Sequence, residues 1–443
     1  MEMDCRVCCN GNTDLRINIL PSASPKTGLV LFFYLSMKKI VLAFSGGLDT
    51  SFCVPYLKET YGADVYTAFV DTVGLDEHVR VTIEERAMAL GAKSHISIDA
   101  TQEMYDQHIA YIIKGNVLRG GVYPLCVGVE RVVQARKVLE FAREIGADAV
   151  AHGSTGAGND QVRFDGTMRI LADNITVLTP IRELGLSREA STIFLRERGF
   201  PVSDARKDYS INQGLWGTTI GGKETHDSRL PLPDEAYPDT VAPALAPEQP
   251  EEVSILFKHG LPYALNGQSL DPISLIRSLN EIGAKHGVGR DMHVGDTILG
   301  IKGRVGFEAP AALMLIKSHQ ELEKLVLTKW QRFQKDHLAD FYGMLLHEGQ
   351  YYDPVMRDIE AFMDSSQEIV QGVVRVRLFK GHFSVLGAES DYSMFNTHVA
   401  TYGESNSLWD SRDAEGFTKI YTVPAMLAHR AKAIGDQANR HDS

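Results

Sequence analysis

The stretch that decides the fold is VLAFSGGLDTS, residues 41–51. The apolar run before the glycines predicts a buried strand, and the apolar spacing that follows predicts a helix. Glycines let a backbone approach a bulky anion, and the free N–H groups of a first helical turn point at that anion. The stretch therefore predicts a phosphate-binding loop, with a plain turn capped by serine as the structural alternative. Its spacing matches neither the Gly-Lys-Ser/Thr loop nor G-x-G-x-x-G.

The sequence around this loop alternates between strand and helix patterns from residue 39 to about 200. Further strands are predicted at residues 63–71, 94–99, 146–154 and 174–181. Strands that alternate with helices indicate a doubly wound parallel sheet, an α/β fold. Ligands of such sheets bind at the carboxyl ends of the strands, where the glycine-rich loops 45–51 and 153–160 both fall.

The rest of the chain indicates an α+β domain. Residues 221–252 are rich in proline and charge and predict a long loop or arm. Other segments predict hairpins or helices by their periodicity. These are hairpins at 253–267 and 371–388, and helices at 271–287, 319–349 and 422–440. We expect an ATP-binding domain at 37–205, a synthetase domain at 206–418 and a C-terminal oligomerisation helix at 419–443.

Composition excludes several classes of function. The net charge of −12 argues against a nucleic-acid partner, because such partners need a basic surface. The apolar run LVLFFYL near residue 30 is far too short to span a membrane. Residues 1–36 read as a flexible extension or a wrongly assigned start, and their cysteines (Cys5, Cys8 and Cys9) are weak evidence for zinc. Cys53 and Cys126 indicate reduced thiols, and we expect a cytoplasmic protein.

A second motif, HGSTGAGNDQVRFD at residues 152–165, accompanies the first. The SGGLDTS loop resembles the signature of the N-type ATP pyrophosphatases, which cleave ATP between its α and β phosphates. The two motifs together resemble one family of that group, the argininosuccinate synthases. Weaker similarity continues through residues 285–290, 302–310 and 414–417.

The resemblance implies a reaction that joins citrulline to aspartate. The ureido oxygen attacks the α-phosphate of ATP, pyrophosphate leaves, and the aspartate amine then displaces AMP. Such catalysis rests on positioning and on charge stabilisation, so we assign no side chain as nucleophile or base. Mg²⁺ would neutralise the pyrophosphate and bind mainly phosphate oxygens, so no protein ligand is nominated.

The resemblance also implies roles for individual residues. Arg163 offers a bidentate fork for a substrate carboxylate, and Asp160 suits the ammonium group of aspartate. The residues implied to bind ATP are Ala43, Phe44, Ser45, Gly46, Gly47, Leu48, Asp49, Thr50, Ser51, Asp71 and Gly153. Those implied to bind aspartate are Thr155, Asn159 and Asp160, and those for citrulline are Tyr123, Gly128, Asn159, Arg163, Ser210, Thr219, Gly295 and Phe307.

Each of these roles has a structural alternative. Tyr123 could be ordinary core, Arg163 could serve a surface ion pair, and Asn159-Asp160 could be turn chemistry.

Several positions depart from the pattern of the family. Ala157 replaces a usual Lys, and residues 126–128 replace Gly, Thr and a small residue. Gly295 stands where most members carry a Glu that faces citrulline, and Phe307 replaces a Tyr. A buried ammonium without a partner is costly. Citrulline remains the first expectation, with Asp296 as the obvious substitute acid; an N-acylated citrulline is the alternative.

Other readings of the loop are a tRNA-modifying adenylating enzyme, a non-enzymatic nucleotide sensor and an amidotransferase-linked synthetase. The folded region offers neither a basic surface nor a catalytic cysteine pair for the first. The second loop argues against a sensor, and no glutaminase domain is visible. The resemblance implies a homotetramer.

Overall fold

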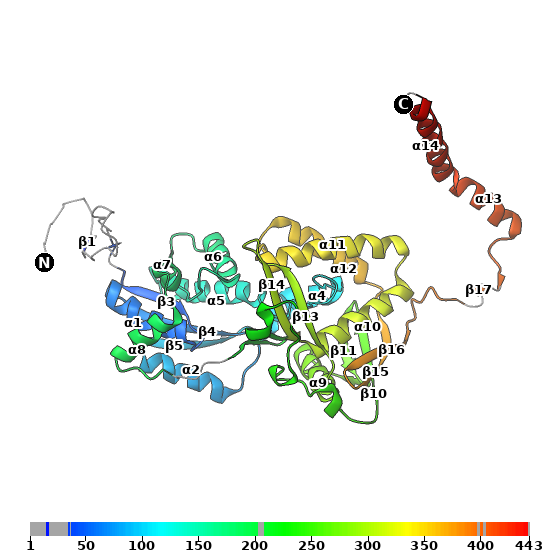
Figure 1. Ribbon diagram of the computed structural model, residues 1–443. Coiled ribbons are helices and arrows are strands. Elements are labelled where there is room, and N and C mark those ends of the chain that lie inside the picture. Colours follow the sequence, from blue (N-terminus) through cyan, green and yellow to red (C-terminus); the bar gives the residue numbers. More distant parts are fainter. Residues whose placement is uncertain are drawn as a thin grey trace. The chain divides into compact units, whose positions relative to one another are not determined.

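The computed structural model (Figure 1) forms two compact units, residues 1–392 and 393–443. Residues whose structure it describes are 15–16, 34–35, 37–202, 208–396, 399–401 and 405–441. The short strands β1 (Leu15–Arg16) and β2 (Tyr34–Leu35) pair with each other. The reading of the remainder of 1–36, including its three cysteines, lies outside the described residues. The expected boundaries between domains stay predictions.

The first part of the chain is a parallel five-stranded sheet of order β5-β4-β3-β6-β7. The strands are β3 (Lys39–Ala43), β4 (Asp64–Asp71), β5 (Ser94–Asp99), β6 (Ala149–Ala151) and β7 (Thr176–Leu178). The chain starts in the middle, moves to one edge and then crosses to the other. This order confirms the predicted doubly wound α/β fold, and its switch point lies between β3 and β6.

Helices cover both faces of this sheet, as the alternation of its side chains requires. Ile40 and Leu42 of β3 join the cluster that contains α1, whereas Val41 joins the cluster that contains α5. The helices of this part, with the π-helix η1, are α1 (Leu48–Tyr61), α2 (Glu77–Ala89), α3 (Thr101–Met104), η1 (Tyr105–Ile109), α4 (Ala110–Gly115), α5 (Glu130–Glu144), α6 (Asp160–Leu171), α7 (Pro180–Leu184) and α8 (Arg188–Glu197).

Two antiparallel sheets follow, with orders β13-β14-β9-β8 and β12-β11-β10-β15-β16. The two predicted hairpins are confirmed as β10 with β11 and β15 with β16. The proline-rich arm holds only the short 3₁₀ turns η2 (Lys223–His226), η3 (Asp234–Ala236) and η4 (Pro243–Leu245). The strands are β8 (Ser210–Gly214), β9 (Gly217–Gly221), β10 (Glu251–Lys258), β11 (Leu261–Leu265), β12 (Gln268–Ser269), β13 (Arg290–Asp296), β14 (Lys302–Glu308), β15 (Gly372–Phe379) and β16 (His382–Glu389).

The predicted single helix at 319–349 is wrong: the segment belongs to two helices, α10 (Pro310–Val326) and α11 (Lys329–Glu348). Leu327 is extended, and the Thr328 side chain caps the second helix while Gln331 returns the bond. This Thr-x-x-Gln capping box was visible in the sequence. The helix predicted at 271–287 is confirmed as α9 (Pro272–Lys285), with Asp271 as its N-cap. Helix α12 (Pro354–Gln367) completes this part.

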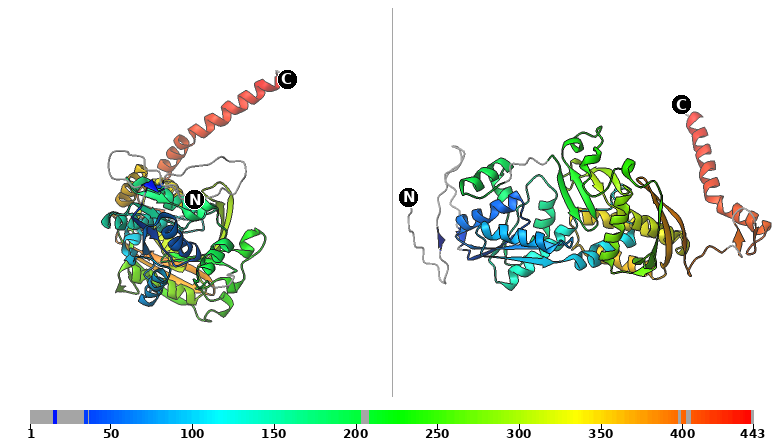
Figure 2. Two further views of the ribbon diagram at one scale, coloured as in Figure 1. Left: turned by 90° about the vertical axis from the view of Figure 1, so that its left-hand side faces the viewer. Right: turned by 90° about the horizontal axis from the view of Figure 1, so that it is seen from below.

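The second unit contains the strand pair β17 (Ala400–Thr401) and β18 (Ser405–Asn406) and two helices (Figure 2). Helix α13 (Ser411–Tyr421) precedes α14 (Val423–His441), which confirms the predicted terminal helix. None of the helices in the described part of the chain is long and apolar enough to cross a membrane. Cys53 and Cys126 are buried free thiols.

Candidate functional site

The two glycine-rich loops meet at the switch point of the parallel sheet. The first follows β3 and the second follows β6, and these strands are hydrogen-bonded neighbours. A Cβ added to Gly153 would lie 3.1 Å from Thr50 Cγ2 and 3.2 Å from the Thr50 nitrogen. Only a residue without a side chain allows this approach. The pairing of β3 with β6 thus places both motifs at one ligand-binding edge.

The first loop has the geometry of an anion cradle. Gly46 has φ +72°, and Gly47 begins α1 without any side-chain cap. The hydroxyls of Ser45 and Thr50 lie 3.3 Å apart, and Thr50 also donates to the Gly47 carbonyl at 3.3 Å. Ser45 Oγ accepts a hydrogen bond from the Gly47 nitrogen at 3.4 Å, just before the helix, but no side chain caps α1 itself. The N–H groups of the first helical turn therefore stay available to a ligand.

The other residues of this loop differ in their exposure. Ser51 is fully buried, and its hydroxyl accepts a hydrogen bond from Arg86 Nε at 2.9 Å. Phe44 is buried with its ring edge-on to His95. Burial raises the pKa of Asp49, which Arg188 opposes. Arg86, on α2, is a cation beside the loop that sequence analysis missed.

Asp71 lies at the end of β4, one strand away from the loop. Its carboxylate is 1% exposed and accepts hydrogen bonds from the backbone of the turn that follows, at 2.7 Å from Gly74 and 2.8 Å from Leu75. Arg80 adds an ion pair at 2.8 Å. The side chain is therefore engaged in shaping its own turn, and a place beside adenosine stays a prediction.

The second loop ends at α6, whose first turn carries the expected aspartate-binding residues. Asn159 is the N-cap residue, and its Oδ1 accepts from the Ile298 nitrogen at 3.0 Å. Asp160 forms ion pairs of 3.0 Å with Arg131 and Arg163. Burial raises the pKa of Asp160, but these two guanidinium groups outweigh it and hold the pKa below its usual range. The carboxylate is thus ionised and 42% exposed, as an acceptor for an ammonium group requires.

Thr155, the third expected aspartate residue, is exposed on the second loop, two residues before Ala157. No hydrogen bond ties the Thr155 side chain to Asn159 or Asp160, so its place in the site stays a prediction.

Arg163 is buried, and it forms an ion pair with the partly exposed Asp160, so the ion-pair alternative is confirmed in part. Its Nε and Nη2 donate to the His347 carbonyl at 3.0 and 2.8 Å. A Cβ on Gly128 would lie 2.6 Å from Arg163 Nη1. Gly128, at φ +110°, therefore leaves the space that the guanidinium occupies.

Several residues expected to bind the ureido substrate lie on neighbouring strands or pack against one another. Phe307 of β14 pairs with Thr219 of β9, and its buried ring lies edge-on to Tyr123, with 5.3 Å between centroids. Ser210 lies two residues from Asn212, the cross-strand partner of Thr219, so its side chain shares that face. Tyr123 is therefore part of the core and also lies against Phe307, another residue expected to bind citrulline, so the core alternative and the binding role are compatible.

Gly295 of β13 faces the same region through His293. The His293 ring stacks on Tyr123 at 5.4 Å, and a Cβ on Gly295 would lie 2.5 Å from His293 Nε2. Asp296, the expected substitute acid, is 64% exposed and pairs with Lys302 at 2.6 Å. Its side chain thus serves a surface ion pair.

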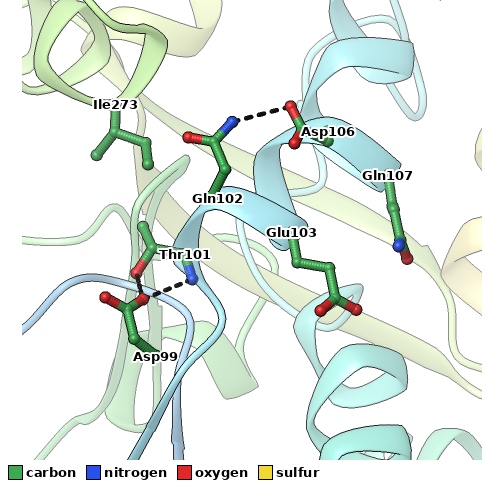
Figure 3. Close-up of a pocket in the computed structure, with 7 residues that line it drawn as sticks. All are labelled: Asp99, Thr101, Gln102, Glu103, Asp106, Gln107 and Ile273. Carbon is green, nitrogen blue, oxygen red and sulfur yellow. Dashed lines mark hydrogen bonds between the residues drawn. The ribbon is translucent and has the colours of Figure 1, made fainter.

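A hollow of about 560 Å³ lies beside the start of α3 (Figure 3). None of the expected site residues lines it. Its lining residues are Asp99, Thr101, Gln102, Glu103, Asp106, Gln107 and Ile273. The Asp99 carboxylate is taken by the backbone and hydroxyl of Thr101, and Gln102 donates to Asp106. These bonds organise the start of α3.

Residues missed by sequence analysis come mainly from distant parts of the chain. Arg119 donates to the Asp296 carbonyl, and His347 lies against both Arg119 and Arg163. Arg131 holds Asp160. Of these residues, only Arg119 could have been noticed in the sequence, because it directly precedes Gly120-Gly121 and lies close to Tyr123.

Comparison with known proteins agrees with the two-motif site. The family model for the arginosuccinate synthase N-terminal HUP domain matches residues 39–201, and that for the C-terminal domain matches residues 209–428. An argininosuccinate synthase of Methanocaldococcus jannaschii is 41% identical over 392 residues, covering 88% of this chain and 98% of the relative.

Two further relatives match over a similar length. The argininosuccinate synthase of Pyrococcus furiosus is 40% identical, over 88% of this chain and 94% of the relative. That of Crocosphaera subtropica is 41% identical, over 88% of this chain and 97% of the relative. The chain therefore belongs to the argininosuccinate synthase family.

Proposed function

We propose that this protein condenses citrulline with aspartate at the expense of ATP. The observation that carries the proposal is the meeting of the two loops at the sheet's switch point, with Asp160 and Arg163 at the start of α6. A nucleotide at the first loop would then lie beside the Asp160 carboxylate, which suits an ammonium group, and the Arg163 guanidinium, a cation that suits a carboxylate. Family membership supports the same reaction.

The reaction proceeds in two balanced steps. The ureido oxygen forms a bond to the α-phosphorus of ATP, and the bond to the β-phosphate oxygen breaks, so pyrophosphate leaves. The aspartate amine then attacks the ureido carbon, and the carbon–oxygen bond to AMP breaks. A proton from the amine is lost to solvent or phosphate. No side-chain nucleophile is needed, because adenylation supplies the leaving group.

The residues of this chain act by position and charge. The N–H groups at Gly46 and in the first turn of α1 hold the phosphates. Asp160 and Asn159 orient aspartate. Its amine is therefore already positioned for the second step, which makes that step effectively unimolecular. A direct contact between Arg163 and a substrate carboxylate stays a prediction, because Nε and Nη2 already donate to the His347 carbonyl and Nη1 donates to Asp160.

Mg²⁺ is proposed to arrive with the nucleotide. Across the described residues there is no group of three or more His, Cys, Asp or Glu side chains placed to hold a metal ion. The donor set therefore does not fit a protein-held cation, and no step is assigned to one. Phosphate oxygens are the ligands that Mg²⁺ takes in such sites.

Release of pyrophosphate tests the function. Purified protein with ATP, magnesium and aspartate is expected to release pyrophosphate and AMP in equal amounts only when a ureido amino acid is added. Asp160→Asn should raise KM for aspartate much more than KM for ATP, since it removes the charge that holds the ammonium group. Retained ATP without pyrophosphate release would favour the sensor reading instead.

The proposal extends to assembly and location. The apolar residues of α13 are exposed within its own unit, which supports a contact between copies and the homotetramer that the family implies. The two buried free thiols support a reducing, cytoplasmic location.

A further inference from the structure

The space beside Gly295, where the proposed function places the ureido substrate, is occupied by the side chains of His293 and Arg119. A Cβ on Gly295 would meet His293 Nε2 at 2.5 Å and Arg119 Nη1 at 3.4 Å. The residue directly across the strand pair is also a glycine, Gly303. An acidic side chain at position 295 therefore has no room while His293 and Arg119 keep their places.

Among the described residues, the nearby acids Asp296 and Asp160 are engaged by other partners, and Glu348 acts on the Arg119 pKa less than Asp296 does. Asp296 points its side chain to Lys302 and offers only its backbone oxygen to Arg119. Asp160 is shared by two other arginines, Arg131 and Arg163. A free α-ammonium bound here would lose water without gaining an anionic partner, and it would face a like charge.

Two histidine ring nitrogens in this region also lack hydrogen-bond partners among the described residues. His347 Nδ1 lies 3.2 Å from Arg163 Nη2 and 3.5 Å from Arg119 Nη1, so Nδ1 accepts and the proton of the neutral ring is on Nε2. His347 Nε2 and His293 Nε2 are both buried without a hydrogen-bond partner in the described chain, and the two residues are 8% and 6% exposed.

Both rings are neutral. Burial, then Arg163 and Arg119, lowers the pKa of His347 to about 3. Burial, then Arg119, lowers the pKa of His293. Burial also lowers the pKa of Arg119, against the opposing charge of Asp296 and a smaller one of Glu348.

Buried polar atoms without hydrogen-bond partners are costly, and a ligand that pairs with them relieves that cost. We propose that the ureido substrate is a citrulline whose α-amine is acylated. The acyl carbonyl oxygen accepts a hydrogen bond from Arg119, and the acyl amide pairs with His293 Nε2, which either tautomer of the neutral ring allows. The inference rests on the proposed function and changes nothing at the reacting end. The acyl amide takes no part in bond making, and the product keeps it.

The first test compares two substrates in the same pyrophosphate assay. With N-acetylcitrulline we expect kcat/KM at least about tenfold above that with citrulline, the size of one charge-assisted hydrogen bond. Equal or better turnover of citrulline would overturn the inference and leave the proposed function standing. No pyrophosphate release with either compound would overturn the proposed function itself.

Variants then test which residue recognises the acyl group. Arg119→Gln should raise KM for N-acetylcitrulline on the order of ten- to a hundredfold while KM for ATP and for aspartate stays unchanged. A general folding defect would move all three constants. The matched control is Arg143→Gln, because Arg143 is 43% exposed and pairs with Asp173 on the surface. An unchanged KM for N-acetylcitrulline in Arg119→Gln would overturn the assignment.

A double variant should reverse the preference. Gly295→Glu with His293→Ser supplies an acid and removes the ring that would collide with it. We expect this protein to use citrulline better than N-acetylcitrulline, since a free ammonium then has a partner. Retention of the original preference in a variant with normal thermal unfolding would contradict the role given to this end of the pocket.

Discussion

At the scale of the residue, Gly153 allows the close approach of the two loops that the proposed nucleotide site requires. Its backbone lies so close to Thr50 that an added methyl would press on the first turn of α1. We expect Gly153→Ala to raise KM for ATP about tenfold, because forcing a methyl into filled space costs about 1–3 kcal/mol. Initial rates at varied ATP measure this.

The control for this change is Gly166→Ala. A Cβ on Gly166 meets nothing within 4 Å, and the residue lies inside α6. This variant should leave KM for ATP alone and add up to about 1 kcal/mol of helix stability. Equal effects of the two alanines on KM would refute the close-approach argument.

His108 gives the protein a defined response to acid. It is fully buried with both ring nitrogens unpartnered in the described chain. Burial and, second, Arg357 lower its pKa from 6.5 to about 3. The unfolded chain therefore binds an extra proton below about pH 6.5, so this contribution to stability is full above that pH and is lost as the pH falls toward 3.

His108→Leu should remove this dependence. Between pH 8 and pH 5.5 we expect the free energy of unfolding of the variant to fall by about 1 kcal/mol less than that of the parent. Urea unfolding at the two pH values measures it. An identical drop in both proteins would mean that other buried histidines carry the whole effect.

At the scale of the element, α10 and α11 are joined by a buried ion pair. Lys335 Nζ lies 2.8 Å from Glu323 Oε2, and the two side chains are 0% and 2% exposed. Asn116 and Gln367 also donate to this carboxylate. The break between the helices at Leu327 is what lets α11 turn back so that the pair can form.

Glu323→Gln should destabilise the protein by about 3–5 kcal/mol, because it leaves the Lys335 charge buried without a counter-ion. The matched control is Glu252→Gln, which breaks an exposed strand pair with Arg377; it should cost less than about 1 kcal/mol. Chemical denaturation of both variants measures the difference. Similar losses would show that Lys335 reaches water.

At the scale of the whole molecule, the second unit exposes an apolar face that its own fold does not cover. Phe417, Ile420 and Tyr421 recur at helical spacing on α13 and are 65%, 76% and 70% exposed. If this face joins copies of the chain, Ile420→Glu should lower the assembled mass. Lys419→Gln, whose side chain pairs only with Glu415 on the same helix, should not.

Light scattering after size exclusion measures both masses. An unchanged assembly in Ile420→Glu, or a monomeric parent protein, would exclude this face as the contact.

Local chemistry was readable from the sequence at the two loops. Gly46 and Gly47 indicated a backbone that can approach a bulky anion, and Gly153 lies against Thr50 of the first loop. The strand–helix alternation around these glycines indicated the sheet. The capping box at Thr328 was equally local, yet it was overlooked because the apolar spacing continues across it. These signals are legible because each depends on residues a few positions apart.

By itself, the sequence determined the fold class, the two loops and the expected ligand-binding edge, since hydrophobic periodicity and glycine placement act over short range. Only the tertiary structure decided what surrounds those loops. Arg163 meets His347 across 184 residues, and Arg119 meets Asp296 across 177. Such pairings depend on how sheets and helices pack, and no local pattern encodes them. The charged groups beside Gly295, where the ureido substrate is proposed to bind, are therefore determined by tertiary packing.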